Sequence, residues 1–245
     1  MRQKNLAASV LGLAALLTIG CSSAAQKSGD EAAPKVQVVG EMKNVMRKGQ
    51  LEGTIHLDTI SNRQHLYGLG PVEYLAGELM ILDGRAYKAT VATDSTIRVE
   101  ETFDVKAPFF GYAHVPRWRE QELPENISNL TQLERYLDEL TTTARRPFLF
   151  RLEGEVENAK IHVVNLPEGT KVSSPEQAHL GQKNYQLEDR EAEIIGFFSK
   201  EHKAIFTHHD TYQHLHLLTA DKRMMGHLDE VTFKAGAMKL YLPEE

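Results

Sequence analysis

Residues 212–227 read Y-Q-H-L-H-L-L-T-A-D-K-R-M-M-G-H, and three histidines lie in this stretch. His214 and His216 are separated by one residue, so their side chains project from the same face of a strand. A polar turn over residues 219–223 precedes His227. If residues 213–218 form one strand and His227 begins the next, the hairpin returns the third imidazole beside the first two.

Three neutral imidazoles with an open fourth position are the usual protein share of a catalytic zinc site. The alternative is a set of surface histidines on an exposed hairpin, because a single histidine usually binds no metal. An H-x-H pair with a third histidine across a turn favours metal binding. We therefore expect Zn²⁺ to be held by His214, His216 and His227.

The overall composition is that of an ordinary globular protein. The chain has 245 residues and a formal charge of −6, with 41% hydrophobic and 25% charged residues, so it is long enough to bury a core. It has no excess of basic residues, so we do not expect it to bind nucleic acid. Its single cysteine excludes an internal disulfide framework.

The N-terminus has the pattern of a bacterial lipoprotein signal. Arg2 and Lys4 precede an apolar run over residues 6–19, which has signal-peptide length and is too short for a convincing membrane span. The run ends in L-T-I-G-C, residues 17–21, which resembles a lipoprotein cleavage box. We expect residues 1–20 to be a signal peptide and Cys21 to carry lipid, with plain secretion as the alternative. Residues 21–35 then form a flexible tether, and the exported protein is anchored to a membrane through Cys21.

The remaining residues, 36–245, are expected to form one domain built mainly of hairpins. The E-L-M-I-L segment at Glu78–Leu82 predicts a buried strand, the D-G pair after it predicts a turn, and residues 85–91 predict the return strand. Glu78 is then an acid at the head of a largely buried strand, and a solvent-facing strand end is the alternative.

Further helices and strands are predicted from the spacing of apolar residues and from the prolines and glycines that interrupt them. Leucines at helical spacing predict a helix over residues 126–140, and Ser174 followed by a proline predicts the start of a short one. Residues 36–48 are ambiguous between a strand and a short helix. Further strands are predicted at residues 97–105, 109–115, 147–154, 156–164, 185–187, 192–199, 231–233 and 238–242, with a turn at the E-G pair of residues 153–154. The fold class is α+β, with mixed and antiparallel β-sheets in two packed parts and few helices.

Four segments together resemble the bacterial α-acetolactate decarboxylase family. They are Y-G-L-G…L-A-G-E-L…D at residues 67–83, A-P-F at 107–109, R-L-E-G at 151–154, and I-G-F…Y-Q-H-L-H-L…A-D-K…M-G-H at 195–227. The resemblance covers about residues 40–242. It implies an acetolactate decarboxylase-like fold, commonly dimeric, and a zinc-dependent carboxy-lyase that removes CO₂ from acetolactate to give acetoin. The three histidines fall on the family's zinc ligands, and Glu78 falls on its active-site glutamate.

This sequence departs from the family in three places. His162 stands where the family has an arginine that supports the substrate carboxylate, and a histidine is shorter and lacks the bidentate fork. The family's second glutamate, from a C-terminal extension, is missing unless Glu244 or Glu245 replaces it. Two additional residues lie in the loop before Tyr212, where the side chains of residues 208–210 (H-H-D) either add metal ligands or face solvent.

The departures leave three functional interpretations. The first is decarboxylation of acetolactate or a similar α-hydroxy-β-keto acid, with Glu78 catalytic and His162 binding the substrate. The second is a relative that keeps the metal but performs different chemistry, such as tautomerisation or hydrolysis. The third is a non-catalytic metal- or ligand-binding surface lipoprotein.

Overall fold

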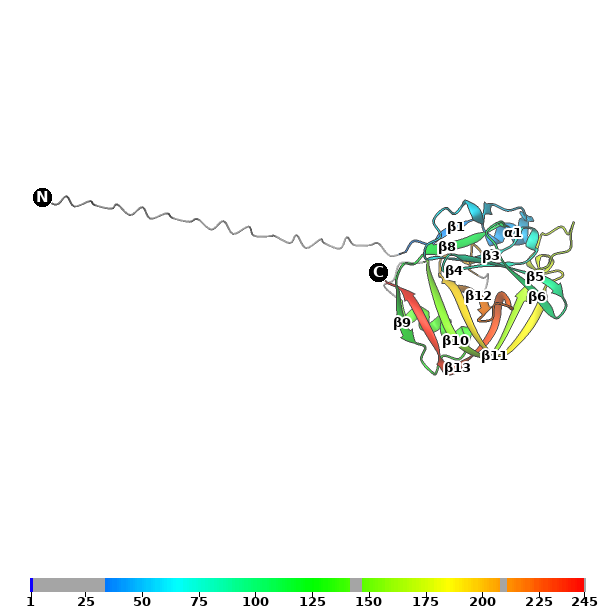
Figure 1. Cartoon of the computed structure of the whole chain (residues 1–245). Coiled ribbons are helices and arrows are strands. Elements are labelled where there is room, and N and C mark those ends of the chain that lie inside the picture. The colour runs from blue at the N-terminus through cyan, green and yellow to red at the C-terminus, as the bar shows by residue number, and fades with distance from the viewer. Residues whose placement is uncertain (2–33, 142–146, 208–210, 245) are drawn as a thin grey trace. The chain divides into compact units, whose positions relative to one another are not determined.

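A computed structural model describes Met1 and residues 34–141, 147–207 and 211–244 (Figure 1). The fold is that of the described residues from 34 to 244. Cys21 and most of the expected signal peptide and tether lie outside the described residues. Within the described part of the chain, no helix is both long and apolar enough to span a membrane.

One half of the domain is a six-stranded sheet with the strand order β1-β8-β3-β4-β5-β6. The predicted hairpin is confirmed: Asp83 and Gly84 both have positive φ, as a tight two-residue turn between β4 and β5 requires. The strands are β1 (Gln37–Val39), β3 (Leu66–Pro71), β4 (Glu78–Leu82), β5 (Arg85–Thr93), β6 (Thr96–Glu101) and β8 (Phe110–His114).

The other half is a five-stranded sheet with the order β10-β11-β12-β13-β9. β10 also pairs with β13, so the pairing of four strands returns to its start, and Figure 1 shows these strands curving around one another. Every pairing between the named strands described is antiparallel. The strands are β9 (Trp118–Glu122), β10 (Phe148–Val163), β11 (Lys183–Phe198), β12 (Gln213–Thr219) and β13 (Met225–Pro243).

Three strands of this sheet are longer than the sequence predicts. The predicted turn at residues 153–154 is wrong, because β10 runs through it with a register shift after Gly154. Gly154 has φ +145, and a Cβ there would lie 1.9 Å from the Ala237 carbonyl oxygen of β13. The glycine thus permits close approach of a neighbouring strand within a bulge rather than a chain reversal. The paired segments predicted within β11 and β13 likewise merge into single strands.

Helices are few, as predicted. Helix α2 begins four residues later than expected, because the Asn129 side chain caps it by accepting a hydrogen bond from the Gln132 N–H at 3.0 Å. The ambiguous segment 36–48 contains both β1 and α1. The helices are α1 (Met42–Lys48), α2 (Leu130–Leu140) and α3 (Pro175–Ala178), with short 3₁₀ turns η1 (Leu57–Thr59) and η2 (Glu73–Leu75) and a small sheet of β2 (Ile55–His56) and β7 (Lys106–Ala107).

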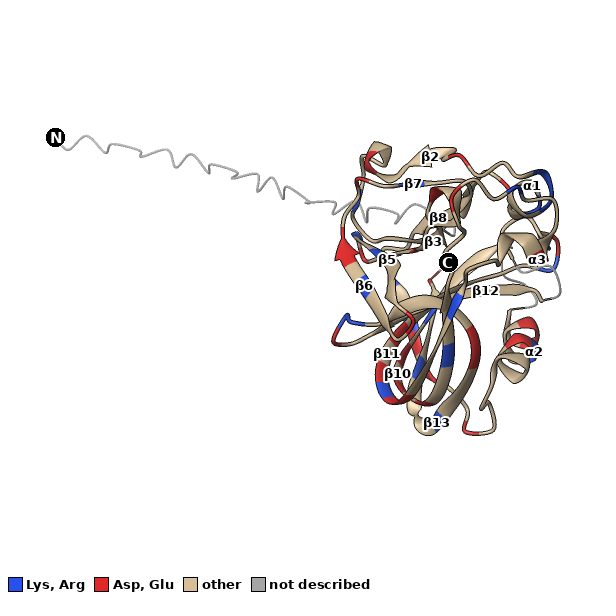
Figure 2. Ribbon diagram, turned by 90° about the vertical axis from the view of Figure 1, so that its right-hand side faces the viewer, with Lys and Arg blue, Asp and Glu red and all other residues tan. Residues whose placement is uncertain are grey.

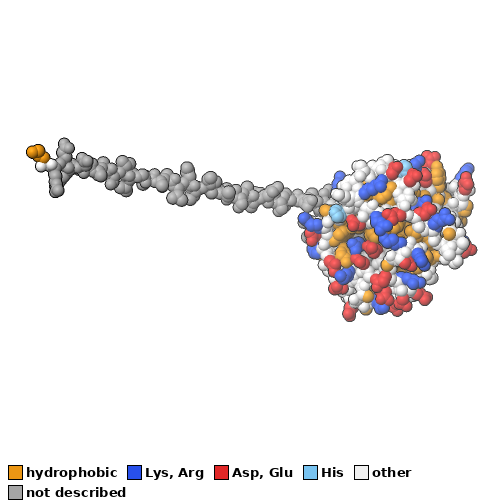
Figure 3. All heavy atoms as spheres, viewed as in Figure 1, with side chains coloured by type: hydrophobic (Ala, Val, Ile, Leu, Met, Phe, Trp, Pro, Cys, Tyr) orange, Lys and Arg blue, Asp and Glu red, His pale blue; other side chains and the backbone are white. Residues whose placement is uncertain are grey.

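The two sheets share one apolar core, which confirms the prediction of two packed parts. Tyr67 and Met80 of the first sheet belong to the same buried cluster as Phe150 and Leu215 of the second. Close packing between them depends on Gly111, where a Cβ would lie 2.9 Å from the Phe197 ring. On the face drawn in Figure 3, acidic and basic side chains are interspersed.

Candidate metal centre

The β12–β13 hairpin brings the three predicted histidines together. His216 lies directly opposite His227 in the ladder, and His214 shares its face of β12. The ring centroids of His214 lie 5.2 Å from His216 and 4.9 Å from His227. Each histidine offers one ring nitrogen, and these three atoms lie within 4.8 Å of one another. This is the spacing of ligands around a single metal ion.

Hydrogen bonding fixes the orientation of the first imidazole. The Nδ1 atom of His214 lies 2.7 Å from the Phe206 carbonyl oxygen, so Nδ1–H donates and Nε2 is the unprotonated nitrogen. A carbonyl acceptor on the far nitrogen is the usual support of a metal-binding histidine. His214 is therefore held in the form that a metal requires.

His216 is fully buried, and neither of its ring nitrogens has a hydrogen-bond partner. Burial, and then the neighbouring His214 and His162, hold its pKa well below the ordinary value, while the Leu79 backbone acts in the opposite direction. The ring is therefore neutral. Leaving a buried polar group unpaired costs about 1–3 kcal/mol, which metal coordination would relieve. The residues present thus fit a metal ion.

Glu78 lies next to this imidazole and is only 3% exposed, which excludes the solvent-facing alternative. Its Oε2 is 3.5 Å from His216 Nε2, and its Oε1 accepts a hydrogen bond from the Val164 N–H at 3.2 Å. Burial raises the pKa of the Glu78 carboxyl well above its usual range, against the Val164 hydrogen bond, and Asp229 raises it further. A buried acid that tends to keep its proton therefore faces the histidine cluster.

His162 is placed beside the cluster by β10, where it pairs with His227 of β13. Its ring stacks on His227 with centroids 4.6 Å apart, and its Nε2 lies 3.9 Å from Glu78 Oε1. Its Nδ1 lies 2.8 Å and 2.9 Å from the two Asp229 oxygens, so Nδ1–H donates and Nε2 faces Glu78. His162, His227 and Asp229 form a second group with metal-ligand spacing.

Asp229 is a site residue that the sequence interpretation missed. It lies two residues after His227, at a register shift between β10 and β13, and its Oδ1 is 4.0 Å from His227 Nε2. Its side chain is partly buried. The signal was the H-x-D spacing of residues 227–229, which repeats the H-x-H spacing of the preceding strand.

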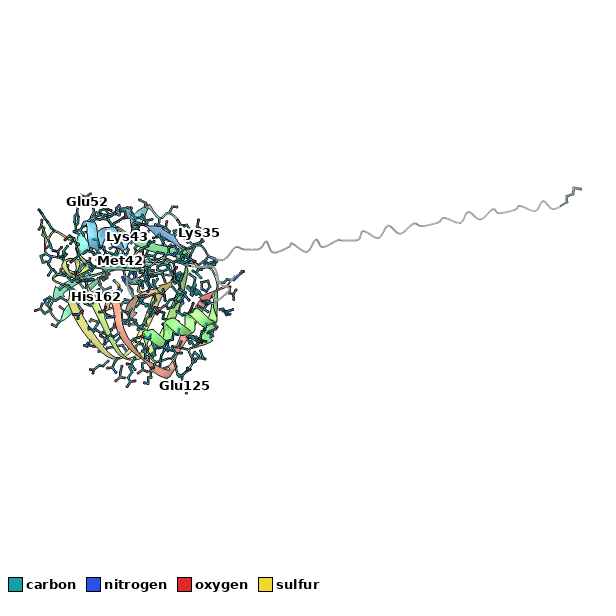
Figure 4. The ribbon with its side chains drawn as sticks, turned by 180° about the vertical axis from the view of Figure 1, so that it is seen from behind. Lys35, Met42, Lys43, Glu52, Glu125 and His162 are labelled. Carbon is teal, nitrogen blue, oxygen red and sulfur yellow. The ribbon has the colours of Figure 1, made fainter. Side chains whose placement is uncertain are left out.

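A pocket opens beside the histidines and is walled largely by apolar side chains. Helices α1 and α3, β3 and β10 all contribute residues to it. Figure 2 shows α1 and α3 side by side, and Figure 4 labels the lining residues Met42, Lys43 and His162. The lining residues are Met42, Lys43, Met46, Arg47, Pro71, Leu75, Glu78, Phe109, His162, Val164, Pro175, His179, Ala204, His214 and His227. His216 lies behind this wall, in contact with Glu78.

Of the residues expected to add to the site from the C-terminus and from the loop before Tyr212, only Glu244 is described. Glu244 does not line the pocket but forms an ion pair with Arg117, at 3.1 Å from the guanidinium Nε. Glu245 and the H-H-D segment at residues 208–210 lie outside the described residues, so their predicted roles remain untested.

Comparison with known proteins agrees with this geometry. The sequence model described as Alpha-acetolactate decarboxylase matches residues 39–244, which is most of the chain. The chain belongs to the α-acetolactate decarboxylase family. The match includes both sheets and every residue of the histidine cluster, so the fold and the family describe the same domain.

Curated members of the family are distant relatives of this chain. The α-acetolactate decarboxylase of Brevibacillus brevis is 26% identical over 193 residues, and the alignment covers 78% of this chain but only 64% of that protein. The enzyme of the same name from Lactococcus lactis subsp. lactis is 28% identical over 200 residues and is covered to 78%. These relatives are named as decarboxylases, which are lyases.

Solved structures of the family share the fold. The crystal structure of α-acetolactate decarboxylase from Bacillus subtilis superposes with a TM-score of 0.70 at 17% identity, covering 86% of each chain. A Staphylococcus aureus protein of unknown function, described as similar to α-acetolactate decarboxylase, gives 0.71 at the same identity and coverage. The predicted fold is therefore confirmed.

Proposed function

We propose that this protein is a zinc-dependent decarboxylase of acetolactate, or of a similar α-hydroxy-β-keto acid, that forms acetoin. The observation that carries the proposal is the buried imidazole of His216, whose ring nitrogens make no hydrogen bond, with the Glu78 carboxyl 3.5 Å away. The named activity of the relatives supports the same substrate class.

His214, His216 and His227 would hold the metal through one ring nitrogen each. When bound, Zn²⁺ supplies a Lewis acid beside the hydroxyl and ketone oxygens of the substrate, where negative charge develops as CO₂ leaves. Because all three proposed ligands are imidazoles, the ligand set itself adds no negative charge that would oppose this effect. The buried carboxyl of Glu78 lies beside this ligand set, 3.5 Å from His216 Nε2.

Glu78 is positioned to move the proton that completes the reaction. Loss of CO₂ leaves an enediolate, and one carbon of it must be protonated to give acetoin. The Glu78 carboxyl is fixed by the Val164 N–H, lines the pocket and has a raised pKa, so it holds a proton close to the reacting carbon. The Nε2 atom of His162 lies 3.9 Å from Glu78 Oε1, and Asp229 orients the His162 ring through Nδ1. His162 therefore helps to hold the Glu78 carboxyl in place.

The pocket wall limits access of water to this proton. Leu75, Phe109 and Val164 belong to one apolar cluster that also contains Met42 and Val45 of α1. Excluding water strengthens every electrostatic interaction in the site and protects the reactive intermediate from stray protons. The enclosed wall therefore favours an enzyme over a simple binding surface.

The direct test is an assay of CO₂ and acetoin release from racemic acetolactate by protein of known zinc content. We expect turnover with one zinc per chain and its loss on chelation. Stoichiometric zinc without acetoin would reject decarboxylation while leaving metal binding intact.

A second candidate function is a different metal-assisted reaction, such as tautomerisation of a hydroxy-ketone. It is favoured by His162, whose bond to Asp229 and short separation from Glu78 form an acid–base pair rather than a carboxylate clamp. Proton NMR of the reaction mixture separates the two, because tautomerisation changes the substrate without CO₂ release. If the zinc-loaded protein changes neither substrate class, the non-catalytic alternative is left.

We further propose that the protein is an exported lipoprotein anchored through Cys21 and that it forms a homodimer. The first proposal is supported by the signal-like residues 1–20 and the second by the family resemblance. Labelling with a radioactive fatty acid should mark the full chain but not a Cys21→Ser variant. Analytical ultracentrifugation of residues 36–245 should give twice the mass of one chain, and a monomer would contradict the second proposal.

A further inference from the structure

Helix α1 borders the pocket and carries two basic side chains that take no part in the proposed proton transfer. Lys43 and Arg47 are four residues apart, so they project from the same side of the helix, and both line the pocket. Figure 2 shows the basic residues of α1 beside α3. Arg47 also lines an adjoining, more open hollow with His162 and Asp229. Arg47 therefore lies where the pocket meets solvent.

The position of α1 is fixed by packing and hydrogen bonds. Met42 and Val45 are buried in the apolar cluster that forms the pocket wall. The Met42 N–H donates to the Ile205 carbonyl at 2.7 Å, and the Lys43 N–H donates to the Ala204 carbonyl at 2.8 Å. The helix is thus held against the wall, and its pocket-facing side chains are presented from a stable base.

The two cations differ in their partners. Lys43 forms an ion pair with Glu41 at 3.1 Å. The Arg47 guanidinium has no hydrogen bond or ion pair with any described residue. Glu176, across the open hollow, has a lowered pKa chiefly through its Ser174 hydrogen bond, with the charge of Arg47 a smaller cause. Arg47 therefore offers an uncommitted planar set of donors at the pocket mouth.

The inner end of the pocket is unsuited to a second carboxylate. Glu78 occupies it, with its carboxyl 3.5 Å from the buried imidazole of His216. Among the described residues that line the pocket, Lys43 and Arg47 are the only lysine and arginine, and both come from α1. The positive side-chain charge of the pocket lining therefore lies at α1.

We propose that Arg47 binds the substrate carboxylate, with Lys43 as a weaker second charge, so that the pocket selects small 2-hydroxy acids. A guanidinium matches a carboxylate through two parallel N–H donors. The hydroxyl end of the ligand then points toward the histidines, and CO₂ forms at the end of the pocket that opens to solvent. The inference deepens the proposed function and rests on it for the chemistry of the ligand.

The test is a thermodynamic cycle that compares the binding of an acid and its amide to the wild type and to Arg47→Gln. 2-Hydroxyisobutyrate carries the hydroxyl and carboxylate but no ketone, so it cannot react, and 2-hydroxyisobutyramide removes only the charge. Titration calorimetry with zinc-loaded protein should show Arg47→Gln weakening the acid about tenfold and the amide hardly at all. Arg47→Lys should recover part of the loss, because a point charge replaces the fork.

Lys48→Gln is the matched control. Lys48 is exposed, lies in the same last turn of α1 and does not line the pocket, so both variants remove one helix-terminal charge. The control should bind the acid like the wild type. Equal weakening of acid and amide by Arg47→Gln, or no binding of the acid to the wild type at millimolar concentration, would overturn the inference.

The outcome is independent of turnover. If acetolactate is not decarboxylated but the cycle still shows coupling between Arg47 and the carboxylate, the proposed function fails and the carboxylate site stands. If turnover occurs but KM for acetolactate is the same in Arg47→Gln and the wild type, the carboxylate site fails and the function stands.

Discussion

Two regions of the five-stranded sheet differ in how their buried polar side chains are paired. Toward the start of β10, Arg151 forms ion pairs with Glu153 and Glu193 and lies 4.4 Å from the centroid of the Tyr241 ring. Eleven residues further along the same strand, His162 lies beside the histidine hairpin, where both nitrogens of His216 lack a partner. The first region pairs its charges internally, with Arg151 Nε left without a hydrogen bond, whereas both ring nitrogens of His216 lack one and could bind a group that the chain does not supply.

This difference indicates where stability and function reside. A paired cluster contributes to folding and gains nothing from a ligand. An unpaired buried imidazole costs free energy until something binds to it. Substitutions in the two regions should therefore have different effects. Those at His216 should abolish metal binding and turnover, whereas those at Arg151 should lower only the stability of the fold.

The largest effect is expected from His216→Ala, which removes one of the three imidazoles. Two remaining ligands should hold zinc at least about a hundredfold more weakly, and turnover should disappear with it. Metal analysis after gel filtration measures this directly. His65→Asn is the control, because this histidine is exposed and asparagine tolerates its positive φ of 52°. Zinc retained in His216→Ala would contradict the assignment.

The next effect is that of Glu78→Gln, which keeps the shape of the side chain but removes its proton-transfer ability. We expect kcat to fall by about 10²–10⁴ while zinc content stays at the wild-type level. Steady-state kinetics with metal analysis on the same sample make the measurement. Unchanged turnover would exclude Glu78 from proton transfer, and loss of zinc would mean that it is a metal ligand instead.

Smaller effects should appear in the stability of the metal-free protein, with opposite signs in the two regions. Arg151→Leu leaves two carboxylates unpaired in a half-buried cluster and should lower the free energy of unfolding by about 1–2 kcal/mol. His216→Leu removes unpaired nitrogens and should raise it by about 1 kcal/mol. Urea unfolding of the two variants, with zinc removed by a chelator, would measure both changes in the free energy of unfolding. Destabilisation by both substitutions would show that the regions do not differ in this way.

The smallest effect is a pH dependence of that same stability. The pKa of His216 is lowered in the folded protein, so only the unfolded chain takes up its proton as pH falls below about 6.5. Between pH 7 and 5.5, metal-free wild type should therefore lose about 1 kcal/mol relative to His216→Leu. The raised pKa of Glu78 has the opposite sign, but it is present in both proteins and cancels to first order. If the unfolding free energies of metal-free wild type and His216→Leu changed equally with pH, His216 would not be a neutral, buried imidazole.

The histidine hairpin was predictable from the sequence because its geometry is local. The H-x-H spacing fixes a strand face, and a short polar turn returns His227 opposite His216. The Asp83-Gly84 turn was predictable for the same reason, since it requires two positive φ values. Glu78 and His162 could be selected only through resemblance to a family, because the contacts that give them meaning span two sheets.

Other features could not be read from the chain. Gly154 has the composition of a turn, and only the approach of Ala237 from a distant strand makes it a bulge. Asp229 gains its role from the His162 ring on another strand. Arg47 is on a short surface helix whose docking over the pocket depends on hydrogen bonds to residues 204–205. Tertiary contacts, rather than local propensity, decide each of these cases.

The central claim is that three imidazoles of one hairpin hold a metal ion. X-ray absorption at the zinc edge of the loaded protein tests it most directly. The account predicts an inner shell that includes three imidazole nitrogens at about 2.0–2.1 Å, reduced to two in His216→Ala. A shell of oxygen atoms alone, or one that His216→Ala leaves unchanged, would contradict it.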